Sequence, residues 1–113
     1  MITTEIVYKN RDNPNVVAFF EDNVAMDFSS VTRVVLKLFN VTNVLQYTED
    51  SDNSPVLIAW ATNEITFNIN DLVLANGSYN AQVVIYDASH PAGQTIAHPQ
   101  ALTDRLVFRY VTA

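Results

Sequence analysis

The 113-residue sequence predicts one all-β domain, spanning residues 1–113 and built as an antiparallel β-sandwich. Short segments alternate apolar and polar residues, as strands with one buried face do. Turn-forming residues separate these segments at short intervals, and no helical period intervenes between them. We count about seven to nine strands of this kind, which is typical of a sandwich or a barrel.

The stretch at residues 64–87 favours one kind of sandwich. It contains two alternating strands joined by a crossing that ends in L-A-N-G-S-Y, with the glycine at Gly77 and the tyrosine at Tyr79. This spacing is typical of a tyrosine corner, in which the tyrosine hydroxyl bonds to the backbone of the crossing between two sheets. We therefore expect an immunoglobulin-like fold in which Gly77 and Tyr79 are structural residues.

The first half of the chain predicts five strands. Residues 31–40 also partly fit a helical period, but four β-branched residues among the first five favour a strand. A polar run at residues 10–15 predicts a turn. Asp22 and Asn23 predict a tight hairpin turn, although Asn-Gly would be the stronger signal. The expected strands are residues 2–9, 16–21, 24–28, 31–40 and 44–48.

The second half predicts four more strands and two loops. Trp60 lies near the end of the first of these strands, and we expect it to fill the core. Residues 49–55 form a polar loop by composition, and residues 88–101 are the longest segment without a regular pattern. The expected strands are residues 56–61, 64–69, 79–87 and 102–112.

Composition excludes several classes of site. The chain has no cysteine, so a disulfide, a thiolate metal site and a cysteine nucleophile are excluded. A net charge of −6 argues against nucleic acid as a partner. No apolar run is long enough for a membrane helix, and the start lacks the pattern of a signal peptide. We expect no cofactor, no membrane contact, and a location in a virion or the bacterial cytoplasm.

Three stretches together resemble the small immunoglobulin-like domains of tailed-phage structural proteins, such as the N-terminal domain of baseplate upper proteins. They read F-F-E-D-N-V-A-M-D-F-S-S-V, V-T-R-V-V-L-K-L and L-A-N-G-S-Y-N-A-Q-V-V-I-Y-D. The resemblance covers most of the chain. It implies a non-enzymatic structural protein of a phage or prophage virion, of the tail or baseplate type, which works by association with itself or with other virion proteins.

Alternation also predicts a partner-binding face. If residues 31–40, 79–87 and 102–112 share a sheet, their outward side chains mix four of the six basic residues with apolar and aromatic ones. Such a mixture is typical of an interaction surface. The alternative is an ordinary solvated face, where Lys and Arg protect the sheet from aggregation. The predicted face comprises Arg33, Val35, Lys37, Phe39, Gln82, Val84, Tyr86, Arg105, Val107 and Arg109.

Acidic residues at 49–52 begin like a calcium loop, with Glu49, Asp50 and Asp52. However, Pro55 stands where the turn glycine belongs and Ala61 where the bidentate glutamate belongs. These departures favour a solvated turn over a metal site.

The segment after Asp87 holds both histidines, His90 and His98. Zinc would need further ligands that the sequence does not indicate, so an ordinary loop is favoured. Ser89 beside Asp87 and His90 lacks the geometry of a catalytic triad, and we expect no enzyme. The loop supports a second hypothesis, a carbohydrate- or cell-surface-binding module at residues 87–101, but it carries no aromatic platform.

Overall fold

The computed structural model describes residues 2–53, 57–101 and 105–112, which form eleven β-strands and no helix. The all-β prediction is confirmed, but the expected count of seven to nine strands is wrong. One predicted strand divides into two, and a segment predicted as a loop is a strand. The strands are β1 (Thr3–Tyr8), β2 (Asn15–Ala18), β3 (Phe20–Glu21), β4 (Val24–Ala25), β5 (Arg33–Phe39), β6 (Leu45–Asp50), β7 (Ile58–Trp60), β8 (Glu64–Phe67), β9 (Gly77–Asp87), β10 (His90–Ala97) and β11 (Leu106–Val111).

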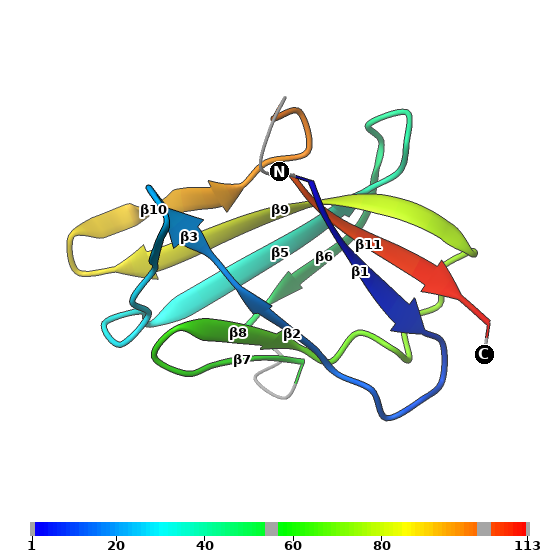
Figure 1. Cartoon of the computed structure of the whole chain (residues 1–113), viewed down its shortest axis with the longest axis horizontal. Helices are drawn as coiled ribbons and strands as arrows, with labels where there is room; N and C mark the ends of the chain where they lie inside the picture. The colour runs from blue at the N-terminus through cyan, green and yellow to red at the C-terminus, as the bar shows by residue number, and fades with distance from the viewer. Residues whose placement is uncertain (1, 54–56, 102–104, 113) are drawn as a thin grey trace.

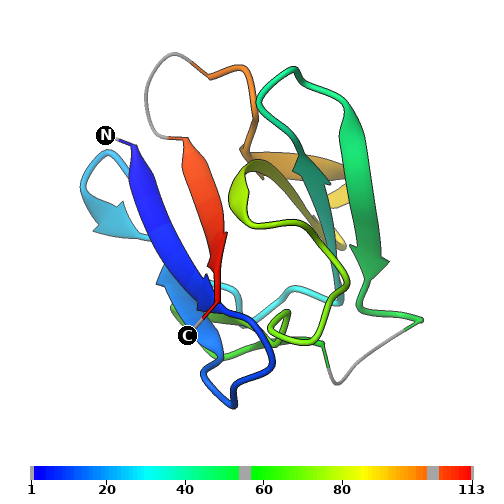
Figure 2. The same ribbon diagram turned by 90° about the vertical axis from the view of Figure 1, so that its right-hand side faces the viewer.

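The strands form two main sheets and a hairpin (Figure 1). The larger sheet has the order β1-β11-β9-β5-β6, and β10 pairs with β9 as its sixth strand. The smaller sheet has the order β2-β8-β7, and β3 pairs with β4 alone. The purely antiparallel arrangement that we expected is wrong at one edge, where β1 runs parallel to β11 (Figure 2).

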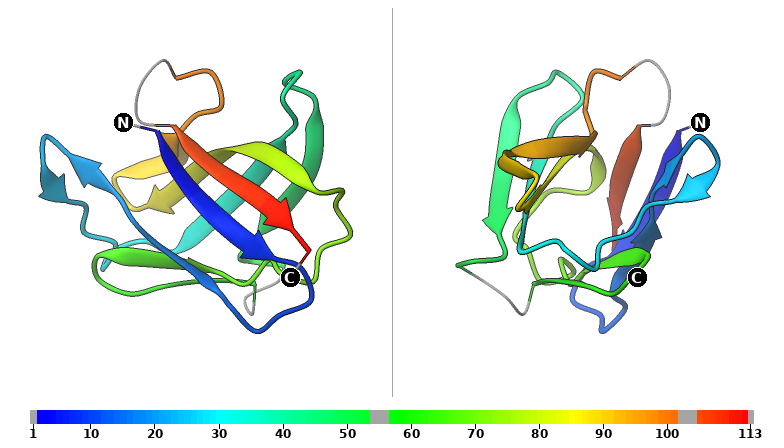
Figure 3. Two further views of the ribbon diagram at one scale, coloured as in Figure 1. Left: turned by 45° about the vertical axis from the view of Figure 1, so that its right-hand side comes forward. Right: turned by 90° about the vertical axis from the view of Figure 1, so that its left-hand side faces the viewer.

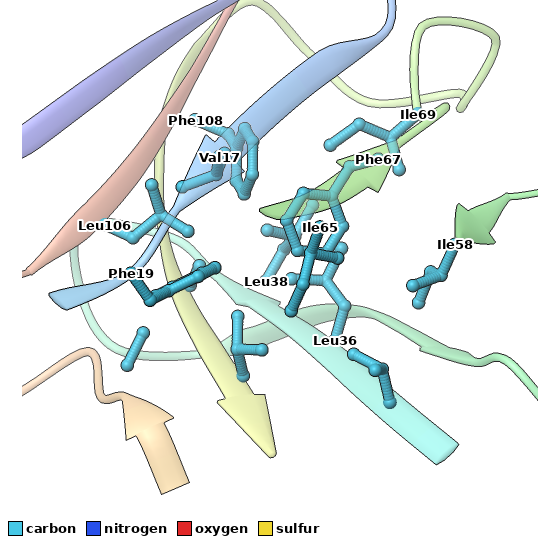
Figure 4. Close-up of a cluster of buried hydrophobic side chains, with 14 of the residues drawn as sticks. Val17, Phe19, Leu36, Leu38, Ile58, Ile65, Phe67, Ile69, Leu106 and Phe108 are labelled. Carbon is cyan, nitrogen blue, oxygen red and sulfur yellow. The ribbon is translucent and has the colours of Figure 1, made fainter. Parts of the chain in front are cut away.

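One hydrophobic core joins the two sheets (Figure 4). Val34, Leu36 and Leu38 alternate along β5 and are fully buried, as their period of two predicts. Across the interior, the rings of Phe67 from β8 and Phe108 from β11 meet edge to face at 5.4 Å. Because the chain has no cysteine and can form no disulfide, apolar contacts of this kind are what hold the two sheets together.

The predicted contact of Tyr79 is confirmed. Its side chain is buried, and its hydroxyl donates to the carbonyl of Ala75 at 2.7 Å. Gly77, two residues before it, has φ of +140°, a conformation that residues with a Cβ rarely adopt. Trp60 differs from its prediction, because it is only partly buried and packs against the core rather than filling it.

The predicted turn at Asp22 and Asn23 is confirmed, and both residues have positive φ, 52° and 64°. The hairpin that it closes is shorter than expected. The chain leaves strand geometry at Phe19, whose side chain turns into the core, so residues 16–21 divide into β2 and β3. Figure 3 shows the β3–β4 hairpin standing away from the rest of the molecule.

The predicted loop at residues 88–101 is wrong over most of its length, because His90–Ala97 is strand β10. Pro91 lacks an N–H group and is tolerated because β10 lies at a sheet edge. The pairing register with β9 shifts between His90 and Gln94, which accommodates the irregular residues. The polar loop predicted at residues 49–55 is also partly wrong, because Glu49 and Asp50 belong to β6. Pro55 and the predicted strand starts at residues 56 and 102 lie outside the described residues.

Candidate interaction face

The outer face of the six-stranded sheet brings two rows of the predicted residues together. The β5–β9 register places Arg33 opposite Tyr86, Val35 opposite Val84, and Lys37 opposite Gln82. Phe39 lies opposite Asn80 at the end of the same ladder. The alternation of buried Val34, Leu36 and Leu38 directs this second set away from the core. The sequence predicted the two outward sets by alternation, and the register between the strands, which has no bulge, comes from the structure.

A hollow of about 400 Å³ lies over these rows. β10 forms one side of it, because its backbone passes close to the face at Gly93. A Cβ built on Gly93 would lie 2.6 Å from Cγ1 of Val84 and 2.9 Å from the ring of Tyr86. The hollow is lined by Arg33, Val35, Lys37, Thr48, Asp50, Gln82, Val84, Tyr86, Ala92, Gly93 and Thr95. The face is therefore concave, and Val35 is only 8% exposed.

Arg33 is held in place at one end of the hollow. Its Nε lies 3.0 Å from Oδ1 of Asp50, and its Nη2 lies 2.5 Å from Oδ2. The guanidinium also stands 4.5 Å from the centroid of the Tyr86 ring, a cation–π contact. The hydrogen bond from Arg33 lowers the pKa of Asp50, so this carboxylate stays charged at neutral pH. Much of the Arg33 charge is thus neutralised within the chain.

Lys37 and Arg109 are the two cations that this face leaves available. Within the described residues, neither forms an ion pair, whereas Arg33 contacts both Asp50 and Asp52. Lys37 lines the hollow directly. Arg109 is exposed on β11, further along the same sheet. A cation without an internal partner can pair with a group brought by another molecule.

Six of the ten predicted residues line the hollow, whereas Phe39, Arg105, Val107 and Arg109 do not. Of these four, Arg105 lies in a different place. It immediately precedes β11 and lines a separate pocket between β2, β3, β10 and β11. Val107 and Arg109 do extend the face, opposite Asn80 and Ser78 of β9. The ten predicted residues therefore divide between two places on the molecule.

The face continues onto β1, which sequence reasoning did not include. The parallel register places Ile6 beside Arg109 and Tyr8 beside Val111. Ile6 and Tyr8 are 37% and 40% exposed, whereas Val7 between them is fully buried. Alternation along residues 2–9 places Ile6 and Tyr8 on one side of the predicted strand, but it does not show which strand β1 joins. Pairing across almost the full length of the chain leaves no local signal.

No family model, curated protein or solved structure matches this chain. The role of the outer face must therefore be argued from its own residues. No helix that could cross a membrane occurs in residues 2–53, 57–101 and 105–112.

The acidic residues considered for calcium have partners within the chain. Glu49 is buried and accepts a hydrogen bond from the hydroxyl of Tyr47. Asp50 binds Arg33 as described, and Asp52 lies 3.5 Å from the same Nε. Among the described residues, no group of three or more His, Asp or Glu side chains is arranged to hold a metal.

The histidines serve local turns. His90 Nδ1 lies 2.9 Å from Oδ1 of Asp87, and the same oxygen accepts the His90 backbone N–H at 2.8 Å. These bonds lower the pKa of Asp87 and close the β9–β10 hairpin around Ser89. His98, beyond the other end of β10, accepts the N–H of Gln100 at Nδ1. The carbohydrate-binding hypothesis assumed an extended loop here, and most of that segment is a strand without aromatic residues.

Proposed function

We propose that this chain is a non-enzymatic structural domain that assembles with other proteins through the outer face of its six-stranded sheet. The observation that carries the proposal is the hollow beside Lys37. It combines a cation that has no ion-pair partner among the described residues with the apolar side chains of Val35 and Val84. Exposed Ile6 and Tyr8 extend the apolar surface onto β1. A concave surface with arginine, tyrosine and apolar groups has the composition of a protein interface.

The charge distribution indicates what the partner presents. The chain carries twelve acidic and six basic residues, and two of the basic ones, Lys37 and Arg109, are available on this face. An acidic surface would complement them. Two copies meeting face to face would instead place like charges together. A second copy is therefore expected to bind head to tail, with its acidic surface on this face, which is the geometry of rings and filaments.

The strand order supports the more specific hypothesis of an immunoglobulin-like sandwich. A Greek-key domain of this type places the strand after the tyrosine corner in the centre of one sheet, as β9 is here. The bond from Tyr79 to Ala75 supports the same hypothesis. The resemblance to tailed-phage domains then favours a virion as the assembly. Genes for tail or capsid proteins beside the gene for this chain would support that assignment.

Light scattering after size-exclusion chromatography tests the assembly proposal. We expect the mean mass to rise with protein concentration at low salt and to rise less at high salt, because salt screens charge pairing. Lys37→Glu should abolish the rise. Lys9→Glu is the matched control, since it makes the same charge change outside the hollow and should leave association intact.

A monomeric mass at every concentration would contradict self-assembly. The heteromeric form is tested by cross-linking the wild-type chain and both variants to virion proteins from the same genome. Loss of cross-links in Lys37→Glu alone would support the outer face as the interface. Equal cross-linking of all three proteins, or association that survives Lys37→Glu, would show that the outer face is not the interface.

A further inference from the structure

A second concave site lies between β2, the β3–β4 hairpin, and strands β1, β10 and β11 of the larger sheet. It has a volume of about 240 Å³ and shares no residue with the hollow of the outer face. Strands β1, β2, β3, β10 and β11 each contribute to it, so segments far apart in the sequence meet here. Its lining is Thr3, Val17, Ala18, Phe19, Phe20, Asn23, Ile96, Ala97, Arg105 and Leu106.

Arg105 gives this apolar pocket a cation. Its Nε is buried and has no hydrogen-bond partner among the described residues. No carboxylate of the described residues forms an ion pair with it either. Buried polar groups are almost always satisfied, and each exception calls for an explanation. In a protein with a net charge of −6, an arginine without an acidic partner among the described residues stands out from Arg33, which binds two.

We infer that this pocket binds a carboxylate attached to a small branched or aromatic apolar group. A guanidinium offers its donors in a planar fork that matches the two oxygens of a carboxylate. Phe19, Ile96 and Leu106 provide the apolar wall for the attached group. The volume lies slightly below the usual range for drug-sized ligands, so it suits a group the size of one leucine side chain with its acid.

Two sources share this chemistry, a free organic acid and the C-terminal residue of a polypeptide. Two probes separate them. The compound 4-methylpentanoate carries only the apolar group and the acid, whereas N-acetyl-leucine adds the amide of a peptide chain end. Their neutral counterparts, 4-methylpentanamide and N-acetyl-leucinamide, keep the shape and remove the charge.

The test is titration of ¹⁵N-labelled full-length protein, followed by NMR chemical shifts of backbone amides. Ligands of this size bind with dissociation constants on the order of 1–10 mM. We expect both acids to shift the amides of Val17, Phe19 and Ile96, and the neutral amides to bind at least about tenfold more weakly, because they lose the charged hydrogen bonds. The tighter of the two acids identifies the source.

Two variants report on the pocket by different routes. Arg105→Gln should weaken binding of the acids about tenfold or more. Ala18→Phe narrows the pocket while Arg105 remains, so it should also weaken binding of the acids. This variant tests the inference if Arg105→Gln fails to fold. Lys9→Gln removes one positive charge elsewhere and should bind as the wild type does.

Four results would overturn the inference. They are no shifts with either acid, shifts outside the pocket, equal binding of acids and amides, or binding that survives both pocket variants. None depends on the assembly proposal, because Lys37 and the outer face are unchanged in every pocket variant.

Discussion

The rings of Tyr79 and Tyr110 meet edge to face at 5.5 Å, and their hydroxyls bind two carbonyls of the segment that joins β8 to β9. Tyr79 donates to Ala75 at 2.7 Å and Tyr110 donates to Ile69 at 2.8 Å. Hydrogen bonds therefore join β11 to the start of the crossing between the sheets and β9 to its end. The motif L-A-N-G-S-Y predicts the first bond, but nothing near Tyr110 in the sequence predicts the second.

Replacing each tyrosine by phenylalanine should separate the two bonds. Tyr110→Phe removes a buried hydroxyl and leaves the Ile69 carbonyl without its partner in the interior. We expect a loss of about 2 kcal/mol in the free energy of unfolding. Tyr79→Phe should cost about 1 kcal/mol, because its bond to Ala75 is only partly buried. Urea denaturation measures both values, and equal losses would contradict the role assigned to burial.

Stability should fall at alkaline pH. Burial raises the pKa of Tyr110 and of Tyr47 above the ordinary value of 10.0, so the folded chain keeps protons that the unfolded chain releases. The stabilisation is complete below pH 10 and decreases as pH rises further, by up to about 1.4 kcal/mol per pH unit for each tyrosine.

Urea denaturation between pH 9 and about pH 11 checks this pH dependence. Tyr110→Phe should reduce the slope, and Tyr8→Phe, which removes an exposed tyrosine, should not. A wild-type slope of zero would contradict the prediction.

Local patterns predict much of this fold and only part of the face. The period of two in residues 31–40 and 79–87 predicted that Arg33, Val35 and Lys37 share an outward face with Gln82, Val84 and Tyr86 if the two strands lie in one sheet, and the structure pairs the two strands directly. That prediction needed only alternation. The register that sets each residue opposite its partner comes from the structure.

The features that the sequence did not predict depend on pairing between distant segments or on residues that are unusual in strands. β1 joins β11 in parallel, and no turn signal marks a pairing between the two ends of a sequence. β10 contains Pro91 and Gly93, which normally argue against a strand. The edge position tolerates the proline, and the register shift between His90 and Gln94 accommodates both residues. Arg105 follows the outward alternation but precedes the first residue of β11, so its side chain lines the pocket.

Gly93→Ala should destabilise the chain by about 2–3 kcal/mol. The residue has φ of +90°, and a Cβ there would lie 2.6 Å from Val84 and 2.9 Å from Tyr86. Gly77→Ala is the matched control, because Gly77 also has positive φ but has no atom within 4 Å of the added Cβ. It should cost about 1 kcal/mol from backbone strain alone. Thermal or urea unfolding measures the difference. A loss for Gly93→Ala no larger than that for Gly77→Ala would show that β10 does not pack closely against Val84 and Tyr86.

Asp50→Asn should lower the free energy of unfolding at neutral pH and leave it unchanged in acid. The hydrogen bond from Arg33 lowers the pKa of Asp50 below the ordinary value of 3.8. The unfolded state therefore binds the proton first as pH falls, so the stabilisation is present above about pH 4 and is lost as pH passes through the folded-state pKa. The loss at pH 7 should be about 1 kcal/mol or less, because the pair is partly exposed and screened.

Asp52→Asn is the comparison for this carboxylate. Asp52 lies 3.5 Å from the same guanidinium but is 62% exposed and makes no fork with it. Its replacement should change the free energy of unfolding less than Asp50→Asn does. Urea denaturation from pH 7 down to about pH 3 follows both variants against the wild type. If the Asp50→Asn difference persists unchanged in acid, its cause is packing or hydrogen bonding of the neutral group rather than the charge of Asp50.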